Sequence, residues 1–256
     1  MLYASPRFTE ESMLRIYDTQ EFADLEPYRE WSYDAWRARG DRTYVTSAQK
    51  VALVERYLPS GSRLLDVGCA TGLFVLEANK KGFWCEGLEP SGMLSTIARD
   101  VLNVAVSTTQ IEDFRTELTF NGIILWDVLE HLYDPVRVLR SCANLLVPGG
   151  VIFLQVPHSD GMSFRLKSML SRIGLKKPGY KHFGFPWHVY AFNRKSLSFM
   201  LERCGFEPVH FESWSHLLKD GKRSFPEDVI IRAARRFCLS DYIVCVARKR
   251  QDYAGS

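Results

Sequence analysis

From about residue 46 onward, the apolar positions of the chain switch repeatedly between two spacings. Short continuous apolar runs predict buried strands at residues 63–67, 83–88, 122–126 and 151–156, and a weaker one at 104–106. Apolar positions three or four residues apart predict helices at 46–57, between the first strands, and at 134–146. Runs of this kind are typical of parallel strands covered on both faces. The alternation therefore predicts an α/β fold with a doubly wound, largely parallel sheet.

Two segments depart from this alternation. The first 45 residues are polar, acidic and rich in aromatic residues, among them Trp31 and Trp36, and we interpret residues 1–45 as a helical cap on a domain formed by residues 46–256. Residues 158–193 form a long insertion after the fifth strand, which is typical of a lid or substrate-binding element. A helix at 195–204 and strands at 206–211 and 243–247 follow it, which brings the predicted sheet to seven strands.

The lid contains an apolar stripe at helical spacing, including Phe164, Met169 and Ile173, with Arg165 and Arg172 on other faces. Such an amphipathic helix could cover the substrate, touch a membrane surface or pack on the domain. The basic residues Lys176, Lys177 and Lys181 follow it. They could attract an anionic acceptor or form an ordinary solvated face.

Composition narrows the class of protein only slightly. The 256 residues are 46% hydrophobic and 25% charged with a formal net charge of +3, values that are ordinary for a globular protein and do not indicate nucleic-acid binding. No apolar run approaches the roughly 20 residues of a membrane-spanning helix, and the N-terminus lacks the pattern of a signal peptide. The six cysteines are scattered without paired spacing, which favours buried thiols and a cytoplasmic location.

The most informative stretch is the glycine turn after the first strand. Asp66 ends an apolar run, Gly68 and Gly72 follow at once, and Glu89 ends the next strand. Glycines permit backbone conformations and close ligand approach that a side chain would block. Ionised carboxylates are acceptors only, so these two acids suit a ligand with a cationic amino-acid end and a ribose diol.

Five motifs, in order and spacing, make the chain resemble the class I S-adenosylmethionine-dependent methyltransferases: LLDVGCATG, GLEPS, IEDF, WDVLEHLYDP and LLVPGGVIFLQVP. The resemblance covers roughly residues 46–211 and is strongest to small-molecule O-methyltransferases, including ubiquinone-pathway enzymes. It implies a seven-stranded Rossmann-like sheet and S-adenosyl-L-methionine as cofactor. The sequence departs from the pattern at Ala70, where many members have glycine.

The resemblance also implies a role for each cofactor-binding residue. Asp66 would lie near the amino group of the cofactor, and Asp127 could hold its ammonium. Glu89 would accept both ribose hydroxyls. Asp113 would accept from the adenine amino group, although a helix or turn cap is the alternative for this residue. The remaining residues would contact the methionine part, the adenine or the ribose: Gly68, Ala70, Gly72, Leu88, Pro90, Phe114 and Trp126.

Methyl transfer from a sulfonium is an in-line displacement that needs alignment rather than a protein nucleophile. A hydroxyl acceptor also needs a base, and histidine titrates in the useful range. Among His131, His158, His182 and His188, we predict His158 and His188 as the catalytic candidates from their places after the fifth strand and in the lid, with a structural role as the alternative for each.

We expect no metal, because a hydrogen-bonded helix start explains Asp127, Glu130 and His131 more simply. The ubiquinone-pathway resemblance leaves a divalent-ion site at these three residues as the alternative.

The predicted function is therefore S-adenosylmethionine-dependent methylation of a small molecule, with a hydroxyl oxygen as the expected target. The acceptor could be a sugar, a lipid, a quinone precursor or a natural product. An NAD(P)-dependent oxidoreductase is the first alternative, but Gly68 and Gly72 do not form the Gly-x-Gly-x-x-Gly pattern. A non-catalytic cofactor-binding protein of the same fold is the second.

Overall fold

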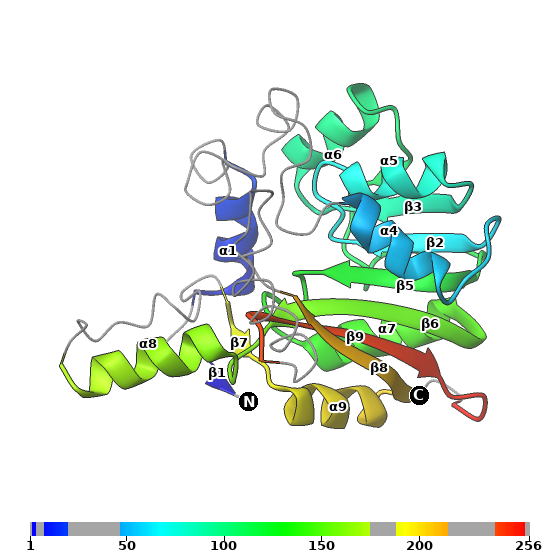
Figure 1. Cartoon of the computed structure of the whole chain (residues 1–256). Helices are drawn as coiled ribbons and strands as arrows, with labels where there is room; N and C mark the ends of the chain where they lie inside the picture. Colours follow the sequence, from blue (N-terminus) through cyan, green and yellow to red (C-terminus); the bar gives the residue numbers. More distant parts are fainter. Residues whose placement is uncertain (1, 4–7, 20–46, 175–187, 215–238, 254–256) are drawn as a thin grey trace, which may run out of the picture.

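A seven-stranded sheet forms the centre of the molecule in the computed structural model, which describes residues 2–3, 8–19, 47–174, 188–214 and 239–253. The strand order is β4-β3-β2-β5-β6-β9-β8, and β9 runs opposite to the other six strands (Figure 1). This sheet confirms the predicted fold class. The strands are β2 (Arg63–Val67), β3 (Trp84–Leu88), β4 (Val106–Ser107), β5 (Phe120–Trp126), β6 (Leu146–Pro157), β8 (Phe206–Trp214) and β9 (Tyr242–Lys249).

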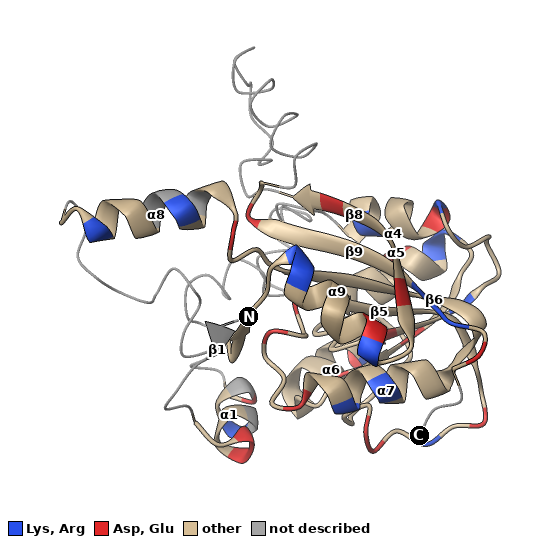
Figure 2. Ribbon diagram, turned by 90° about the horizontal axis from the view of Figure 1, so that it is seen from below, with Lys and Arg blue, Asp and Glu red and all other residues tan. Residues whose placement is uncertain are grey.

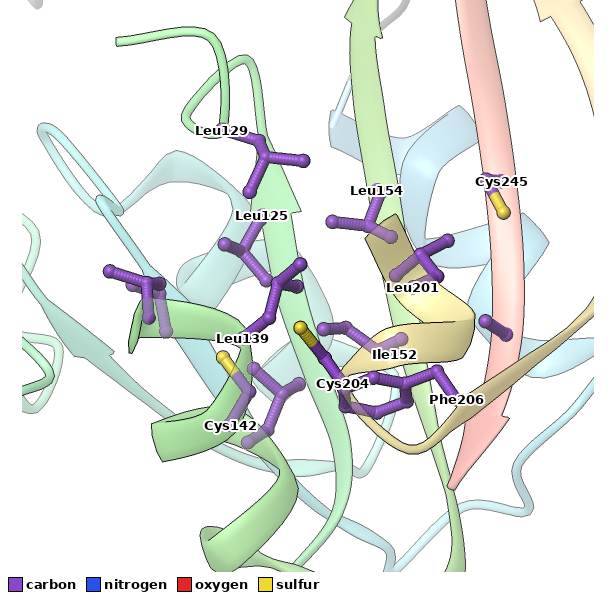
Figure 3. Close-up of a cluster of buried hydrophobic side chains, with 14 of the residues drawn as sticks. Leu125, Leu129, Leu139, Cys142, Ile152, Leu154, Leu201, Cys204, Phe206 and Cys245 are labelled. Atoms are coloured by element: carbon purple, nitrogen blue, oxygen red, sulfur yellow. The ribbon is translucent and has the colours of Figure 1, made fainter. Parts of the chain in front are cut away.

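Helices cover both faces of this sheet (Figure 1). One face packs against α4 (Ser47–Glu55), α5 (Leu73–Lys80) and α6 (Gly92–Asp100). The other packs against α7 (Pro135–Leu145) and α9 (Arg194–Arg203). Figure 3 shows Leu139 and Cys142 of α7 beside Cys204, which follows α9, with Leu125 of β5 and Ile152 and Leu154 of β6 in the same cluster. The continuous apolar runs of the sequence are thus buried on both sides, as parallel strands require.

The chain direction through the sheet places the candidate residues at one edge. The strand order reverses between β2 and β5, which both leave the sheet at the same edge and then enter opposite helical layers. Open α/β sheets bind ligands in the crevice at such a switch point. The glycine turn follows β2 there, and Asp127 follows β5.

Two local predictions are wrong in detail. The Pro148-Gly149-Gly150 stretch lies inside β6 and does not precede the strand, because β6 already begins at Leu146. The register with β5 shifts between Phe120 and Gly122, and Gly149 has φ +73°, so a bulge absorbs this stretch. The weak strand predicted at 104–106 is the two-residue β4.

The N-terminal segment and the end of the lid, residues 188–193, form a small second sheet that the sequence does not predict. We call residues 188–193 the lid return. Its strands β1 (Leu2–Tyr3) and β7 (Tyr190–Ala191) pair antiparallel. In the predicted cap, α1 (Glu10–Tyr17) is helical, and Trp31 and Trp36 lie outside the described residues.

The predicted amphipathic lid helix is α8 (Met162–Arg172), which extends away from the sheet (Figures 1 and 2). Phe164 is buried, whereas Met169 and Ile173 are exposed. Lys176, Lys177, Lys181 and His182 lie outside the described residues. Among the helices described here, none has the length and apolar character needed to cross a membrane.

Candidate active site

The glycine turn is held by the strand ends around it. Gly68 and Cys69 donate backbone N–H bonds to the Leu88 carbonyl of β3 at 2.8 and 3.0 Å. Gly68 has φ +71°, and a Cβ there would lie 2.7 Å from Cγ2 of Val128, directly after Asp127. Only glycine fits this contact, so the turn joins the ends of β2, β3 and β5 at one place.

Ala70 departs from the family pattern without preventing the turn. Its φ is +49°, a left-handed conformation that costs a residue with a Cβ roughly 1–2 kcal/mol. Its N–H donates to Oε2 of Glu89 at 2.9 Å, which offsets part of that cost. A glycine would adopt this conformation more easily, and the small methyl group of alanine keeps the turn compact.

Glu89 is buried and oriented by backbone donors. Its Oε1 accepts from Ser91 N at 2.9 Å, and its Oε2 accepts from Ala70 N. Burial raises the pKa of Glu89, and these two bonds oppose the rise. Each carboxylate oxygen has two lone pairs, so both oxygens keep an acceptor position for a diol.

Asp66 and Asp127 lie at the ends of adjacent strands, near one cation. Burial raises the pKa of Asp66 to about 8, Lys50 opposes this rise, and Glu89 adds to it. Burial also raises the pKa of Asp127, again opposed by Lys50. Nζ of Lys50, on α4, lies 5.4 Å from the centre of the Trp126 ring. Two carboxylates and an ammonium group so arranged match a zwitterionic amino-acid end.

The predicted apolar contacts fall into two groups. Leu88 and Trp126 are buried, and Trp126 packs between Phe74 and Trp214 with ring centroids 6.0 Å from each. Pro90 and Asp113 are exposed, and the N–H of Asp113 donates to the Gln110 carbonyl. The first group is part of the core at the sheet edge, whereas the second lies at the surface.

A second cluster follows β5. Glu130, His131 and His188 each place a potential ligand atom within 4.8 Å of the others, and the two imidazole rings stack edge-on at 4.8 Å. Glu130 is buried, with Oε2 lacking a hydrogen-bond partner among the described residues. Burial raises the pKa of Glu130 well above its usual range, and the Asp127 charge adds to the rise. These donors could hold a proton or a divalent ion.

This cluster differs from the metal alternative considered from the sequence. That alternative grouped Asp127 with Glu130 and His131, but both Asp127 oxygens accept from Nε2 of Gln155 at 2.7 Å. His188, at the return of the lid, joins Glu130 and His131 instead. Backbone N–H groups of Val189 and Tyr190 donate to the Glu130 carbonyl at 2.7 and 3.1 Å and hold the lid return there.

His158 occupies a different environment. Its ring is buried, Nδ1 lies 3.2 Å from the Ser240 carbonyl oxygen, and burial lowers its pKa. Its backbone N–H donates to the Asp241 carbonyl at 2.7 Å. The described contacts of His158 thus join β6 to the segment before β9.

Sequence reasoning missed three polar residues at this edge: Lys50, Gln155 and Asp18. Oδ1 of Asp18 accepts from Ser91 Oγ at 2.8 Å and Met93 N at 3.2 Å, which lowers the pKa of Asp18. In the sequence, Lys50 resembles any surface lysine of an amphipathic helix. Only Gln155, a polar residue inside an apolar strand, carried a signal that could have been noticed.

Comparison with known proteins identifies the class. Residues 36–211 match the family described as methyltransferase domain, which is more than half of the chain. The chain belongs to this family, and its motifs and fold are those of the class I S-adenosylmethionine-dependent methyltransferases. Membership of this family favours S-adenosylmethionine as the cofactor, so the nicotinamide alternative loses its support.

Among curated relatives, the ubiquinone biosynthesis O-methyltransferase of Xanthomonas axonopodis pv. citri is 28% identical over 154 residues, 56% of this chain and 64% of that protein. The corresponding Xanthomonas oryzae enzyme is 32% identical over 114 residues, 42% of this chain and 48% of that protein. The chain thus spans less than two thirds of the length of these relatives.

Solved structures agree on the fold. The Burkholderia thailandensis 1,6-didemethyltoxoflavin-N1-methyltransferase, bound to 1,6-didemethyltoxoflavin and S-adenosylhomocysteine, has a TM-score of 0.60 at 15% identity, covering 96% of this chain and 93% of that one. The [4+2]-cyclase SpnF has a TM-score of 0.56 at 19% identity, covering 79% and 81%. Proteins with different names share this fold, so the acceptor chemistry must be argued from the site.

Proposed function

We propose that the enzyme methylates a hydroxyl group of a small molecule, with His188 accepting the hydroxyl proton. The observation that carries the proposal is the Glu130, His131 and His188 cluster, which lies directly after β5 beside the donor-site residue Asp127. Proton removal is needed for a hydroxyl acceptor. The O-methyltransferase relatives support the choice of oxygen.

The donor side of the proposal uses the residues at the ends of β2, β3 and β5. Asp66 and Asp127 bind the ammonium of the cofactor, Lys50 faces its carboxylate, and Glu89 accepts from the ribose hydroxyls. Trp126 and Leu88 provide apolar surface beside the nucleoside, with Pro90, Asp113 and Phe114 toward the adenine. Gly68, Ala70 and Gly72 have small side chains or none, so the methionine part of the cofactor can approach the backbone of the turn.

When bound, the cofactor would supply the methyl group from its positively charged sulfur to the acceptor oxygen and would leave as S-adenosylhomocysteine. The hydroxyl proton passes to His188, with the neighbouring His131 and Glu130 keeping the imidazole in place. We prefer His188 to His158, because the buried His158 is held against Ser240 and Asp241 in the segment before β9.

Calorimetry tests the donor site. We expect the protein to bind S-adenosylmethionine and S-adenosylhomocysteine, and not NAD or NADP. Binding of NADH without either sulfur compound would overturn the donor assignment.

The His188→Ala variant tests the acceptor side. Loss of the base should lower kcat by about 10²–10⁴-fold with the affinity for S-adenosylhomocysteine unchanged. His210→Ala, on β8, is the matched control and should keep its activity. Activity that disappears on chelation and returns with a divalent ion would instead assign the cluster to a metal, contrary to our expectation.

We also propose that the acceptor is hydrophobic enough to partition into membranes, where α8 would touch the surface. The exposed Met169 and Ile173 beside Arg165 and Arg172 support such contact. An anionic acceptor attracted by Lys176, Lys177 and Lys181 stays a prediction, as does the cytoplasmic location, which the five buried cysteines of the described residues support.

A further inference from the structure

Gln155 is a polar residue in a place where the fold needs an apolar one. It lies on β6, in register with Trp126 of β5 and Val244 of β9, and its side chain is completely buried. Val151 and Phe153, which share its face of the strand, pack in the apolar core. Burying an amide costs free energy unless its hydrogen bonds are made.

Only one half of this amide is used within the described residues. Nε2 donates to both carboxylate oxygens of Asp127 at 2.7 Å, whereas the buried Oε1 has no hydrogen-bond partner among the residues that the structure describes. An unmet buried acceptor weakens the fold. The stability of the fold therefore does not explain why a glutamine occupies this position, whereas its hydrogen bonds to Asp127 do.

Asp127 needs such support because its backbone is strained. Its φ of +58° is in the left-handed region, which a residue with a Cβ seldom adopts. Its N–H donates to the Gln155 carbonyl at 3.1 Å, so one residue holds both the backbone and the side chain of Asp127. Strained backbone persists where the surroundings determine it, and it is concentrated at functional sites.

The Asp127 carboxylate belongs to the donor edge, which is the edge of the sheet where β2, β3 and β5 end and where the proposed donor site lies. Lys50 acts electrostatically on Asp66 and on Asp127, so the two carboxyl groups are influenced by the same ammonium group. A carboxylate fixed before the ligand arrives loses less conformational freedom on binding. A freely rotating Asp127 would have to be ordered by the ligand itself.

We propose that Gln155 is a positioning residue, which holds the Asp127 carboxylate ready for the ammonium of S-adenosylmethionine. The proposal rests on the donor site described under the proposed function. It extends that site by a residue that touches no part of the cofactor and acts through Asp127.

Two ligands separate positioning from a general structural role. S-adenosylhomocysteine carries the amino-acid end, and 5′-methylthioadenosine has the same nucleoside and thioether without it. By calorimetry, Gln155→Leu should weaken S-adenosylhomocysteine binding about tenfold and change 5′-methylthioadenosine binding less than about threefold. Gln155→Glu, which sets a second carboxylate against Asp127, should show the same selective loss.

Asn121→Ala is the control, because Asn121 is also a side-chain amide that makes a hydrogen bond within the sheet, accepting from Arg63 N at 2.9 Å, but at the far end of β5. It should change neither affinity. In an Asp127→Ala background, Gln155→Leu should add no further loss.

Equal weakening of both ligands by Gln155→Leu, or no weakening of either, would overturn the proposal. Failure of the donor site itself looks different, since the unaltered protein would then bind neither ligand. A variant that does not fold is recognised by its melting curve, and Gln155→Glu then decides the question.

Discussion

Buried carboxylates at the donor edge are the residues whose chemistry depends most on their surroundings. Asp66 and Asp127 come from the ends of different strands, and burial favours the neutral form of each. Lys50 opposes this effect from α4. A ligand ammonium would favour the ionised form further, so cofactor binding and proton release are linked at this site.

We therefore expect S-adenosylmethionine binding to release protons at pH 7. With a pKa of about 8, Asp66 is mostly protonated at pH 7 in the free protein and must ionise to bind an ammonium. Affinity should rise from pH 6 to about pH 8, where the α-amino group of the ligand begins to lose its own proton. Calorimetry in two buffers of different ionisation enthalpy measures the release.

Asp66→Asn should abolish most of that proton release and weaken binding.

The raised pKa of Asp66 also determines how the free energy of unfolding changes with pH. Between the ordinary value of 3.8 and about 8, the native state holds a proton that the unfolded chain has lost, so the free energy of unfolding falls as pH rises. A buffer-independent binding enthalpy in the unaltered protein would contradict the assignment.

Glu89→Ala tests the ribose end. Loss of charge-assisted hydrogen bonds should weaken S-adenosylhomocysteine binding by about 1.5–3 kcal/mol, roughly 10-fold to 150-fold. Glu86→Ala, on the same strand but only partly buried, should leave the affinity unchanged. Equal affinities of Glu89→Ala and the unaltered protein would mean that the ribose lies elsewhere.

At the scale of elements, helix starts and the turn before them set the shape of the site. Gly72 precedes α5 with φ +81°, and Ser91 caps the start of α6 because its Oγ accepts from Leu94 N. Asp18, just after α1, also bonds to Ser91 and Met93. The N-terminal segment is thereby attached beside Glu89, and Tyr133 attaches it again through the Phe8 carbonyl at 2.6 Å.

Gly72→Ala should lower the free energy of unfolding by about 1–3 kcal/mol, from backbone strain and overpacking. An added Cβ would lie 2.7 Å from Cγ2 of Val104 and 3.1 Å from Cβ of Ala98. Gly61→Ala is the control, since Gly61 has φ +86° and open space around it, and it should cost only the strain. Urea unfolding measures both, and equal losses would exclude the packing contribution.

At the scale of the whole molecule, one helix stands apart from the compact sheet layers. Figure 2 shows α8 extending from the body, and the exposed Arg165 and Arg172 lie on it. Its exposed Met169 and Ile173 provide apolar surface at the outer end. Basic and apolar side chains together suit an anionic membrane surface.

We expect the protein to sediment with anionic phospholipid vesicles and much less with phosphatidylcholine vesicles. The double variant Met169→Glu with Ile173→Glu should abolish sedimentation and leave S-adenosylhomocysteine binding unchanged. Phe199→Glu, an equally exposed apolar position on α9, should have no effect. Binding that survives the double variant would remove α8 from membrane contact.

The sequence by itself determined the sheet, its helical layers and the donor class, because these follow from local periodicity and from motifs whose residues are close in the chain. Asp66, Gly68 and Gly72 are neighbours in sequence, and Glu89 ends the next strand. Only the tertiary structure decided which distant groups meet. Lys50, Gln155 and Asp18 join the donor edge through packing between elements, and His188 joins Glu130 and His131 through the lid return. Burial, which raises the pKa of Asp66 and of Glu130, is likewise a property of the folded chain alone.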